Sequence, residues 1–259
     1  MLKIIISYLN FLWNSKNEHG VHSPFVFNLV TKCFYDKKKY PGYSILKNYK
    51  NTLLQNKNTI EVTDFGAGSR VFKSNTRAIN KIARNAGISK KRAELLFRIT
   101  NYFQPESILE IGTSLGLATS ALSLGNIKSK ITTIEGCPNT LHVAQKQFEE
   151  FGFNNITSIN TEFSCYLKNY QLAIINYQLI YFDGNHSKEA TLNYFELLLP
   201  TVTNETVWIF DDIHWSPAME VAWEVIKKHP KVTVTIDTFQ WGLVFFRCEQ
   251  PKEHFVIGV

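Results

Sequence analysis

The stretch SILEIGTSLGLATSALS, residues 107–123, determines the fold class. It opens with an apolar run that contains Glu110, breaks at a turn with Gly112 and Gly116, and continues into helix-forming residues. α/β proteins build nucleotide-type pockets in this way, because glycine lets the backbone approach a ligand and the helix N-terminus supplies free N–H groups. The stretch therefore predicts an α/β protein with a nucleotide-type pocket at this turn.

Strands and helices alternate from residue 107 onward. Strands are predicted at 107–111, 130–134, 155–159, 178–183, 205–211, 231–236 and 241–247, and helices at 115–125, 138–151, 163–169, 187–199 and 216–228. Regular alternation indicates a parallel sheet with helices on both faces. The last two strands are too close in sequence for a helical crossover, so they are expected to pair antiparallel. The predicted fold class is α/β, with a Rossmann-like, mostly parallel seven-stranded sheet that ends in an antiparallel hairpin.

The first part of the chain is expected to be a mainly helical extension, 1–106, before a ligand-binding domain, 107–259. A second glycine-bearing stretch, EVTDFGAGSR at 61–70, looks like another pocket loop. A Rossmann-like unit needs a second apolar strand that ends in an acid about 20 residues later. That strand follows Gly112, as KITTIEG, but is absent after Gly68. The 61–70 loop is therefore interpreted as a lid over the pocket or as a structural turn.

The composition excludes several classes of protein. The chain has 259 residues, 44% hydrophobic and 19% charged, with a net charge of +6 spread over scattered basic residues, which does not indicate a nucleic-acid footprint. Its four cysteines form no CxxC pair, which favours free thiols over a zinc or redox site. No segment approaches the roughly 18–20 apolar residues that span a bilayer, so a cytoplasmic location is expected. A helix over 2–14 is expected to dock onto the domain or onto a second copy, with membrane contact less favoured.

The motifs over 107–247 resemble those of the class I S-adenosylmethionine-dependent methyltransferases. LEIGTSLG is similar to their first motif, with Ser114 in place of the usual middle glycine, as in the looser form common among small-molecule O-methyltransferases. The resemblance implies that this turn contacts the methionine part of S-adenosylmethionine. The residues so assigned are Glu110, Gly112, Thr113, Ser114 and Gly116.

An acid ends the second strand at the spacing that the resemblance requires. Glu135, with Gly136 after it, matches the position that binds the ribose, and two carboxylate oxygens can accept from both ribose hydroxyls. The alternative is a solvated carboxylate at the end of a strand. Glu162 and Phe163 follow the third strand, where the family often contacts adenine; Phe163 could equally pack in the core.

Three further acids follow the next two strands. Asp183 ends one, in YFDGNH, and Asp211 and Asp212 end the other, in IFDDIH. Converging carboxylates repel each other unless a cation lies between them, and hard oxygen ligands favour Mg²⁺ or a similar divalent ion. This pattern resembles the metal-dependent O-methyltransferases of the catechol, caffeoyl-CoA and macrocin-like groups.

The expected reaction is O-methylation of a small hydroxylated acceptor, since a metal can lower the pKa of a hydroxyl and a nearby base can take its proton. His186 stands where catechol-type enzymes have a lysine, and an imidazole is a suitable base near neutral pH. Asp183 as the base of a metal-free site is the alternative, and His214 is a further candidate for lining the site. Two other functions are weighed: an N-methyltransferase, disfavoured by DGNH in place of an Asn/Asp-Pro-Pro-aromatic motif, and a non-catalytic cofactor-binding or interaction protein. A homodimer through the N-terminal extension is one expected assembly.

Overall fold

The computed structural model describes residues 2–63, 74–169 and 176–259. The contacts between residues divide the chain into two compact units. Unit 1 is Met1–Tyr35 with Leu167–Val259, and unit 2 is Asp36–Tyr166. The sequence predicted a different division, into a helical extension, 1–106, and a ligand-binding domain, 107–259. That division remains a prediction. No helix of the described residues is long and apolar enough to cross a membrane.

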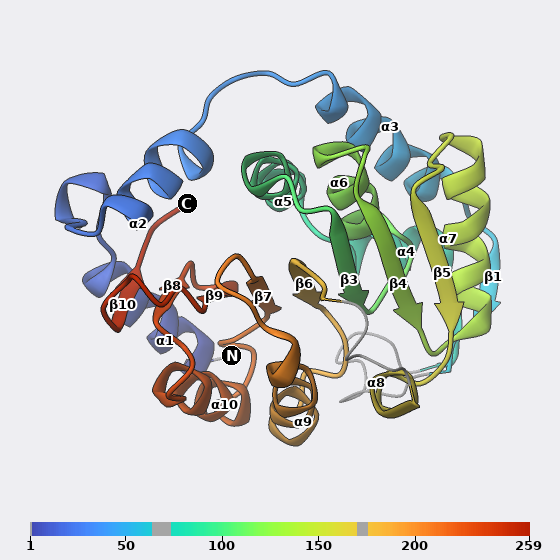
Figure 1. Ribbon diagram of the computed structural model, residues 1–259. Helices are drawn as coiled ribbons and strands as arrows, with labels where there is room; N and C mark the ends of the chain where they lie inside the picture. Colours follow the sequence, from blue (N-terminus) through green and yellow to red (C-terminus); the bar gives the residue numbers. More distant parts are fainter. Residues whose placement is uncertain (1, 64–73, 170–175) are drawn as a thin grey trace. The chain divides into compact units, whose positions relative to one another are not determined.

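Unit 2 contains the stretch that determines the fold class (Figure 1). Its three neighbouring strands are parallel, in the order β3-β4-β5, and Ile108 pairs with Ile131, which pairs with Ile156. The strands are β3 (Ser107–Ile111), β4 (Lys130–Glu135) and β5 (Ile156–Asn160). The helices are α3 (Gly42–Gln55), α4 (Ile79–Asn85), α5 (Lys90–Phe103), α6 (Leu117–Gly125), α7 (Pro138–Glu150) and the start of α8 (Phe163–Asn169). The predicted alternation of strands and helices is confirmed here to within two residues at each end.

Local signals set the ends of these helices. The Ser89 hydroxyl caps α5 by accepting a hydrogen bond from the Arg92 N–H, and the C-cap of α5 is Gln104, whose φ of 48° is left-handed. Pro138 occupies the first turn of α7, where its missing N–H costs nothing.

A short hairpin precedes the parallel strands. β1 (Thr59–Glu61) pairs antiparallel with β2 (Thr76–Ala78), so the predicted 61–70 loop belongs to the connection of a hairpin. Residues 64–73 lie outside the described part of the chain, and the lid stays a prediction. The described end of β1 contacts the start of α7: the Asn139 side chain donates to the Glu61 carbonyl at 2.8 Å.

Unit 1 contains five strands in the order β10-β8-β9-β7-β6. β6 and β7 are parallel, and β9 runs antiparallel to both β7 and β8, which confirms the predicted C-terminal hairpin. The strands are β6 (Leu179–Phe182), β7 (Val207–Asp211), β8 (Val234–Asp237), β9 (Trp241–Phe245) and β10 (Glu253–Val256). The helices are α1 (Leu2–Asn14), α2 (Pro24–Leu29), α9 (Lys188–Leu198) and α10 (Pro217–Lys228), with short helices η1 (Glu18–Gly20), η2 (Val30–Phe34) and η3 (Leu199–Thr201).

The strand β10 adds one strand to the seven that the sequence predicted, and it pairs parallel with β8. Its residues are half-buried or exposed and include Glu253 and His254, so it lacks the apolar run that marked the other strands. The central strands β6, β7 and β9 are buried throughout, and large aromatic side chains such as Trp208, Tyr181 and Trp241 fill the core of unit 1.

Candidate functional site

The glycine turn of unit 2 runs from Gly112 to Gly116, between β3 and α6. Gly112 has a φ of 107°, Ser114 of 49° and Gly116 of 76°, so the chain is left-handed at three of five positions. Gly116 is the N-cap of α6, and a Cβ atom there would lie 2.4 Å from both the Tyr49 hydroxyl and a ring carbon of Phe148. Only glycine fits at this position, for both conformational and steric reasons.

The Glu135 carboxylate joins this turn to the end of β4. Its Oε2 accepts a hydrogen bond from the Ser114 N–H at 2.8 Å, and its Oε1 accepts one from the Cys137 N–H at 2.9 Å. Two backbone donors on different segments thus orient one side chain. The structure therefore brings together Ser114, Glu135 and Gly136, three of the predicted cofactor-binding residues.

The side chain of Asn160, which the sequence did not single out, supports this edge. Asn160 ends β5 and donates to the carbonyls of Glu135 at 2.8 Å and Gly136 at 3.1 Å. An asparagine that ends a strand gives no recognisable motif, so only the pairing of β4 with β5 identifies it. The predicted adenine contacts lie nearby in sequence: Glu162 is exposed just before α8, and Phe163, the first residue of α8, is half-buried.

The Glu110 carboxyl, predicted to bind the cofactor, is buried in β3 with no exposed surface. Its Oε2 accepts hydrogen bonds from the hydroxyls of Thr119 (2.5 Å) and Thr133 (2.6 Å), and its Oε1 has no partner among the described residues. Burial, which outweighs these two bonds, raises the pKa of Glu110 to about 8, and the charge of Glu135 adds to the rise. Glu110 thus stabilises the base of the turn from inside, and at neutral pH it is mostly neutral.

The predicted reacting acids belong to unit 1. Phe182 of β6 pairs with Phe210 of β7, so Asp183 and Asp211 stand at the carboxyl ends of adjacent parallel strands, as the sequence predicted. Asp183 lies 3.6 Å from the His186 Nε2, and both side chains are half-buried. The arrangement suits a histidine that accepts a proton while a carboxylate orients it.

A three-carboxylate metal site is not formed by the described residues. Among them, no group of three or more His, Cys, Asp or Glu side chains could hold a metal ion. Asp211 is only 5% exposed; its Oδ2 accepts from the Tyr181 hydroxyl at 3.2 Å and its Oδ1 from the Asp212 N–H at 2.8 Å. The structure therefore turns the predicted ligand Asp211 toward the core of the sheet, and Asp212, with a φ of 53°, continues the chain into the following loop.

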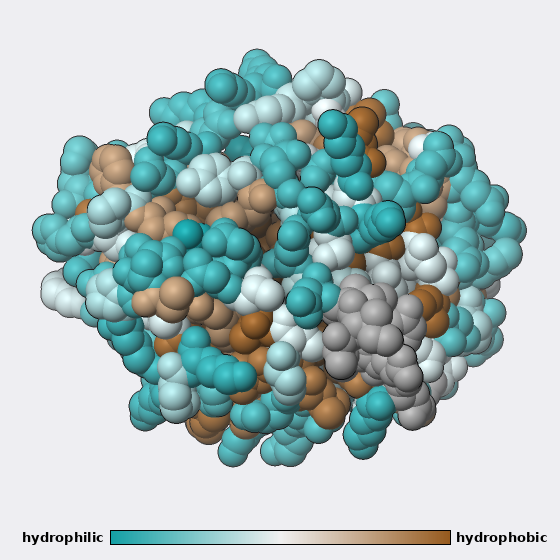
Figure 2. Space-filling model, in the orientation of Figure 1, coloured by the Kyte–Doolittle hydropathy of each residue, from teal (hydrophilic) through white to brown (hydrophobic). Residues whose placement is uncertain are grey.

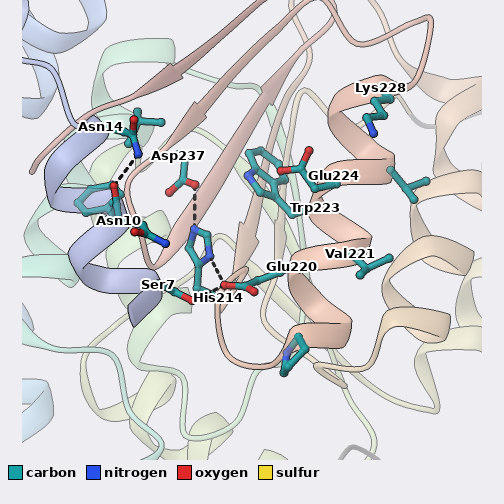
Figure 3. Close-up of a pocket in the computed structure, with 14 residues that line it drawn as sticks. Ser7, Asn10, Asn14, His214, Glu220, Val221, Trp223, Glu224, Lys228 and Asp237 are labelled. Carbon is teal, nitrogen blue, oxygen red and sulfur yellow. Dashed lines mark hydrogen bonds and ion pairs between the residues drawn. The ribbon is translucent and has the colours of Figure 1, made fainter. Parts of the chain in front are cut away.

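A separate cavity of about 720 Å³ in unit 1 contains the third candidate, His214 (Figure 3). Residues of α1, α10 and β8 line it, among them Asn10, Trp223 and Asp237. The His214 ring stacks on Phe239, with ring centroids 5.1 Å apart. Neither Asp183 nor His186 lines this cavity, so His214 is not grouped with the predicted catalytic residues.

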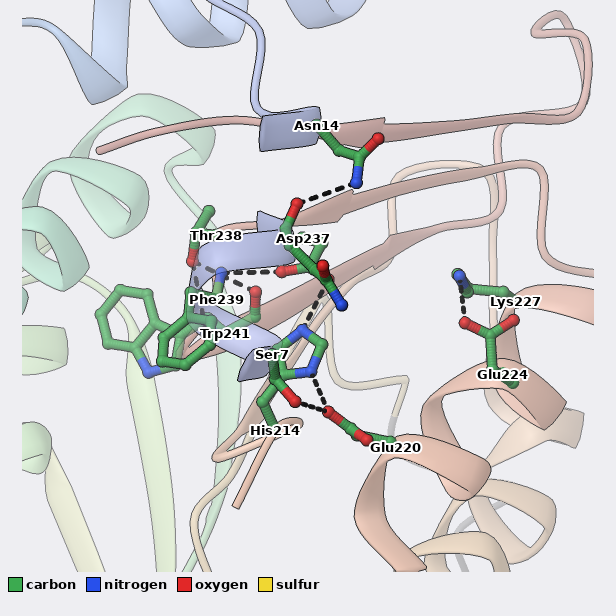
Figure 4. Close-up of polar contacts among 11 residues, drawn as sticks. Ser7, Asn14, His214, Glu220, Glu224, Lys227, Asp237, Thr238, Phe239 and Trp241 are labelled. Atoms are coloured by element: carbon green, nitrogen blue, oxygen red, sulfur yellow. Dashed lines mark hydrogen bonds and ion pairs between the residues drawn. The ribbon is translucent and has the colours of Figure 1, made fainter. Parts of the chain in front are cut away.

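Two carboxylates hold the His214 ring (Figure 4). Its Nδ1 lies 3.0 Å from Glu220 Oε1, and its Nε2 lies 2.8 Å from Asp237 Oδ2. Burial alone would lower the pKa of His214, but the bonds to Asp237 and Glu220 and their charges raise it above its ordinary value. The Ser7 hydroxyl of α1 donates to the same Glu220 oxygen at 2.6 Å. The His214 ring thus ties α1, α10 and β8 together, which is a structural role.

Comparison with known proteins finds similarity to methyltransferases. A family model described as a methyltransferase domain matches residues 109–213. No curated protein sequence matches the chain. Among solved structures, the SAH-bound methyltransferase PaMTH1 of Podospora anserina is 14% identical, with a TM-score of 0.60 over 88% of this chain and 97% of that one.

Two O-methyltransferases are similarly close in fold. The enzyme of Bacillus cereus, in complex with SAH, is 16% identical, with a TM-score of 0.55 over 83% of this chain and 95% of that one. TomG of Streptomyces achromogenes is 14% identical, with a TM-score of 0.57 over 84% of this chain and 95% of that one. TomG is involved in tomaymycin synthesis, and its structure was solved in complex with SAM.

The chain is thus an α/β protein of the Rossmann-like class, with a mostly parallel sheet and a C-terminal antiparallel hairpin. Residues 109–213 are similar to a methyltransferase domain, in line with the family that the sequence motifs resemble.

Proposed function

We propose that this protein transfers a methyl group from S-adenosylmethionine to a hydroxyl oxygen of a small acceptor. The observation that supports the proposal most is the position of Glu135, whose two oxygens accept N–H bonds from the glycine turn and from Cys137. A carboxylate has about four acceptor positions, so an oriented one can also receive the two hydroxyls of a ribose. The match to a methyltransferase domain over the same residues, and the SAM-bound and SAH-bound neighbours, support the same cofactor.

Calorimetry with S-adenosylhomocysteine tests the cofactor pocket. Glu135→Gln keeps the size of the side chain but removes its charge and one acceptor oxygen, so the affinity is expected to fall roughly tenfold or more. Glu149→Gln, at an exposed position of α7, is the matched control and should bind as the wild type does. Wild-type protein that does not bind S-adenosylhomocysteine would exclude this function.

His186 is the base that we propose for the acceptor hydroxyl. When bound, S-adenosylmethionine supplies a methyl group on a positively charged sulfur, which makes the methyl carbon electrophilic. The His186 imidazole takes the hydroxyl proton as the oxygen attacks, and Asp183, 3.6 Å from its Nε2, stabilises the resulting positive charge. The two side chains are three residues apart in the loop after β6, so a short segment supplies both.

The roles of His186 and Asp183 are separable by kinetics. His186→Gln should lower kcat by about 10²–10⁴-fold with little change in S-adenosylhomocysteine affinity, because general-base catalysis contributes that much. Asp183→Asn should have a smaller effect on kcat if Asp183 only orients the imidazole. An Asp183→Asn loss larger than that of His186→Gln would instead make Asp183 the base.

Divalent-metal assistance through Asp183, Asp211 and Asp212 does not fit the arrangement of the described residues. A direct test is methyl transfer with EDTA and with added Mg²⁺. Activity that depends on Mg²⁺ and is lost in Asp212→Asn would restore the predicted metal site.

A second copy of the chain is the partner that we propose for α1. The helix docks through Phe11 and Ser7 but directs a continuous apolar stripe outward. Its exposed members are Ile5, Ile6, Tyr8, Leu9, Leu12 and Trp13, the last of them 90% exposed. The neighbouring α10 adds the exposed Val221 and Val225, and apolar patches interrupt the hydrophilic surface over α10 in Figure 2. A standard interface takes about 800 Å² from each partner, and these exposed apolar side chains supply the apolar part of such a face.

Light scattering coupled to size exclusion tests the dimer. Leu9→Glu places a charge at the centre of the stripe and should convert a dimer into a monomer. Ile127→Glu changes an even more exposed apolar residue of unit 2 outside α1, and should leave the mass unchanged. A wild-type protein that is monomeric at every concentration would refute the assembly without affecting the proposed activity.

A further inference from the structure

A small cavity in unit 2 has a chemistry that methyl transfer does not explain. Its volume is about 250 Å³, and residues of α3, α5, α6 and the turn before α5 surround it. Most of its wall is apolar, formed by Leu46, Leu54, Ile88, Ala93 and Leu117. None of the predicted cofactor-binding residues lines it, so it is distinct from the glycine turn and from Glu135.

One ammonium group lies against these apolar walls. Lys50 is half-buried, and its Nζ donates to the carbonyl of Ile88 at 2.7 Å. Burial lowers the pKa of Lys50, and no carboxylate of the described residues opposes that effect. An ammonium has three donors, so two remain for another acceptor. The cavity thus contains a cation that the described protein solvates only in part.

The other charges at the mouth of the cavity do not neutralise Lys50. Lys90 and Glu94 pair with each other at 3.7 Å, and Lys47 is exposed at the rim. The lining therefore has three lysines against one glutamate. An uncompensated charge beside apolar surface is unfavourable, and an anion that accepts from it removes much of that cost.

We propose that this cavity binds a small carboxylate with an apolar body, its carboxylate on Lys50 and its chain against Leu54, Ile88 and Leu117. A ligand of roughly eight to ten non-hydrogen atoms would fill the space, if each atom takes about as much volume as a water molecule. The apolar walls recognise the chain and the ammonium selects the charge, so an alcohol of the same length binds less tightly.

The test compares octanoate with 1-octanol by calorimetry on the full-length protein. Octanoate should bind the wild type roughly tenfold more tightly than octanol, since a charge-assisted hydrogen bond is stronger than a neutral one. Lys50→Met keeps the aliphatic stem and should reduce octanoate affinity to that of octanol. Lys57→Met, at an exposed lysine that does not line the cavity, should change neither affinity.

A second variant locates the binding. Ala93→Leu fills part of the cavity from α5 and should weaken octanoate and octanol together, with S-adenosylhomocysteine binding as the check that the fold is intact. If the wild type does not bind S-adenosylhomocysteine either, the proposed cofactor pocket is wrong, and the octanoate measurements still test the carboxylate site independently. No octanoate binding, or octanoate binding that survives both Lys50→Met and Ala93→Leu, would overturn the proposal.

Discussion

Replacing Glu110 by glutamine tests whether a buried carboxyl at the base of the glycine turn is neutral at physiological pH. Burial raises the pKa of Glu110 from 4.5 to about 8. A folded-state pKa above the unfolded value means that folding takes up a proton between the two values. The stabilising contribution is therefore complete below pH 4.5 and is lost as the pH rises to 8.

The size of this effect follows from linkage. Each pH unit between the two pKa values changes the free energy of unfolding by about 1.4 kcal/mol, so the wild type should lose about 2.7 kcal/mol between pH 5 and pH 7 through this group. Glutamine is neutral at both values and can still accept from Thr119 and Thr133, so the variant lacks this contribution. Its amide N–H₂ gains no evident partner, because Oε1 has none; that cost is about 1–3 kcal/mol and does not depend on pH.

Urea denaturation at pH 5, 6, 7 and 8, followed by tryptophan fluorescence, measures the difference in unfolding free energy between wild type and Glu110→Gln. That difference should shift in favour of the variant by about 2.7 kcal/mol from pH 5 to pH 7, while other titrating groups cancel. Glu149→Gln, an exposed carboxyl on α7, serves as the control. A Glu110→Gln difference that stays constant to within about 0.5 kcal/mol would refute a neutral, buried Glu110.

Three further substitutions test other parts of the structure. Gly116→Ala should lower the free energy of unfolding, measured by thermal melts, by about 2 kcal/mol or more and weaken S-adenosylhomocysteine binding, because its Cβ would meet Tyr49 and Phe148 at 2.4 Å. Gly152→Ala is the control: Gly152 has a similar φ of 69° but nothing within 4 Å, so this change should cost only the backbone strain of about 1–2 kcal/mol. His214→Gln should lower the free energy of unfolding more at pH 6 than at pH 9. The pKa of His214 is raised in the folded protein, so the stabilisation by its ring is complete below pH 6.5 and is lost as the pH rises through the folded-state pKa. Equal losses at the two pH values would contradict this pH dependence. Ser89→Ala removes the cap of α5 and should lower the free energy of unfolding in urea by about 1 kcal/mol, whereas no change would mean that Arg92 N–H finds another acceptor.

Elements whose signal is local were predictable from the sequence. The strand, turn and helix of 107–125 depend on neighbouring residues, and the structure confirms them. The alternation of buried strands with amphipathic helices was predictable for the same reason. β10 was not, because it is a short and partly polar strand whose identity depends on its pairing with β8.

The candidate site was predictable in its residue types but not in its side-chain partners. Glu135 was expected beside the glycine turn, and it is there, held by Ser114. Asp211, expected at a metal, instead meets Tyr181, 30 positions away in the chain, because the paired strands β6 and β7 bring these side chains together. His214 likewise meets Asp237 across 23 positions.

The sequence by itself determined the class of fold, the place of the glycine turn and the acid that ends β4, since strand periodicity, glycine and strand-end acids are read along the chain. Only the tertiary structure decided that Glu110 is a buried, mostly neutral carboxyl, that α1 presents its apolar side outward and that Lys50 faces an apolar cavity. The physical reason is that burial and charge compensation depend on which distant segments fold against a side chain, and no local pattern carries that information.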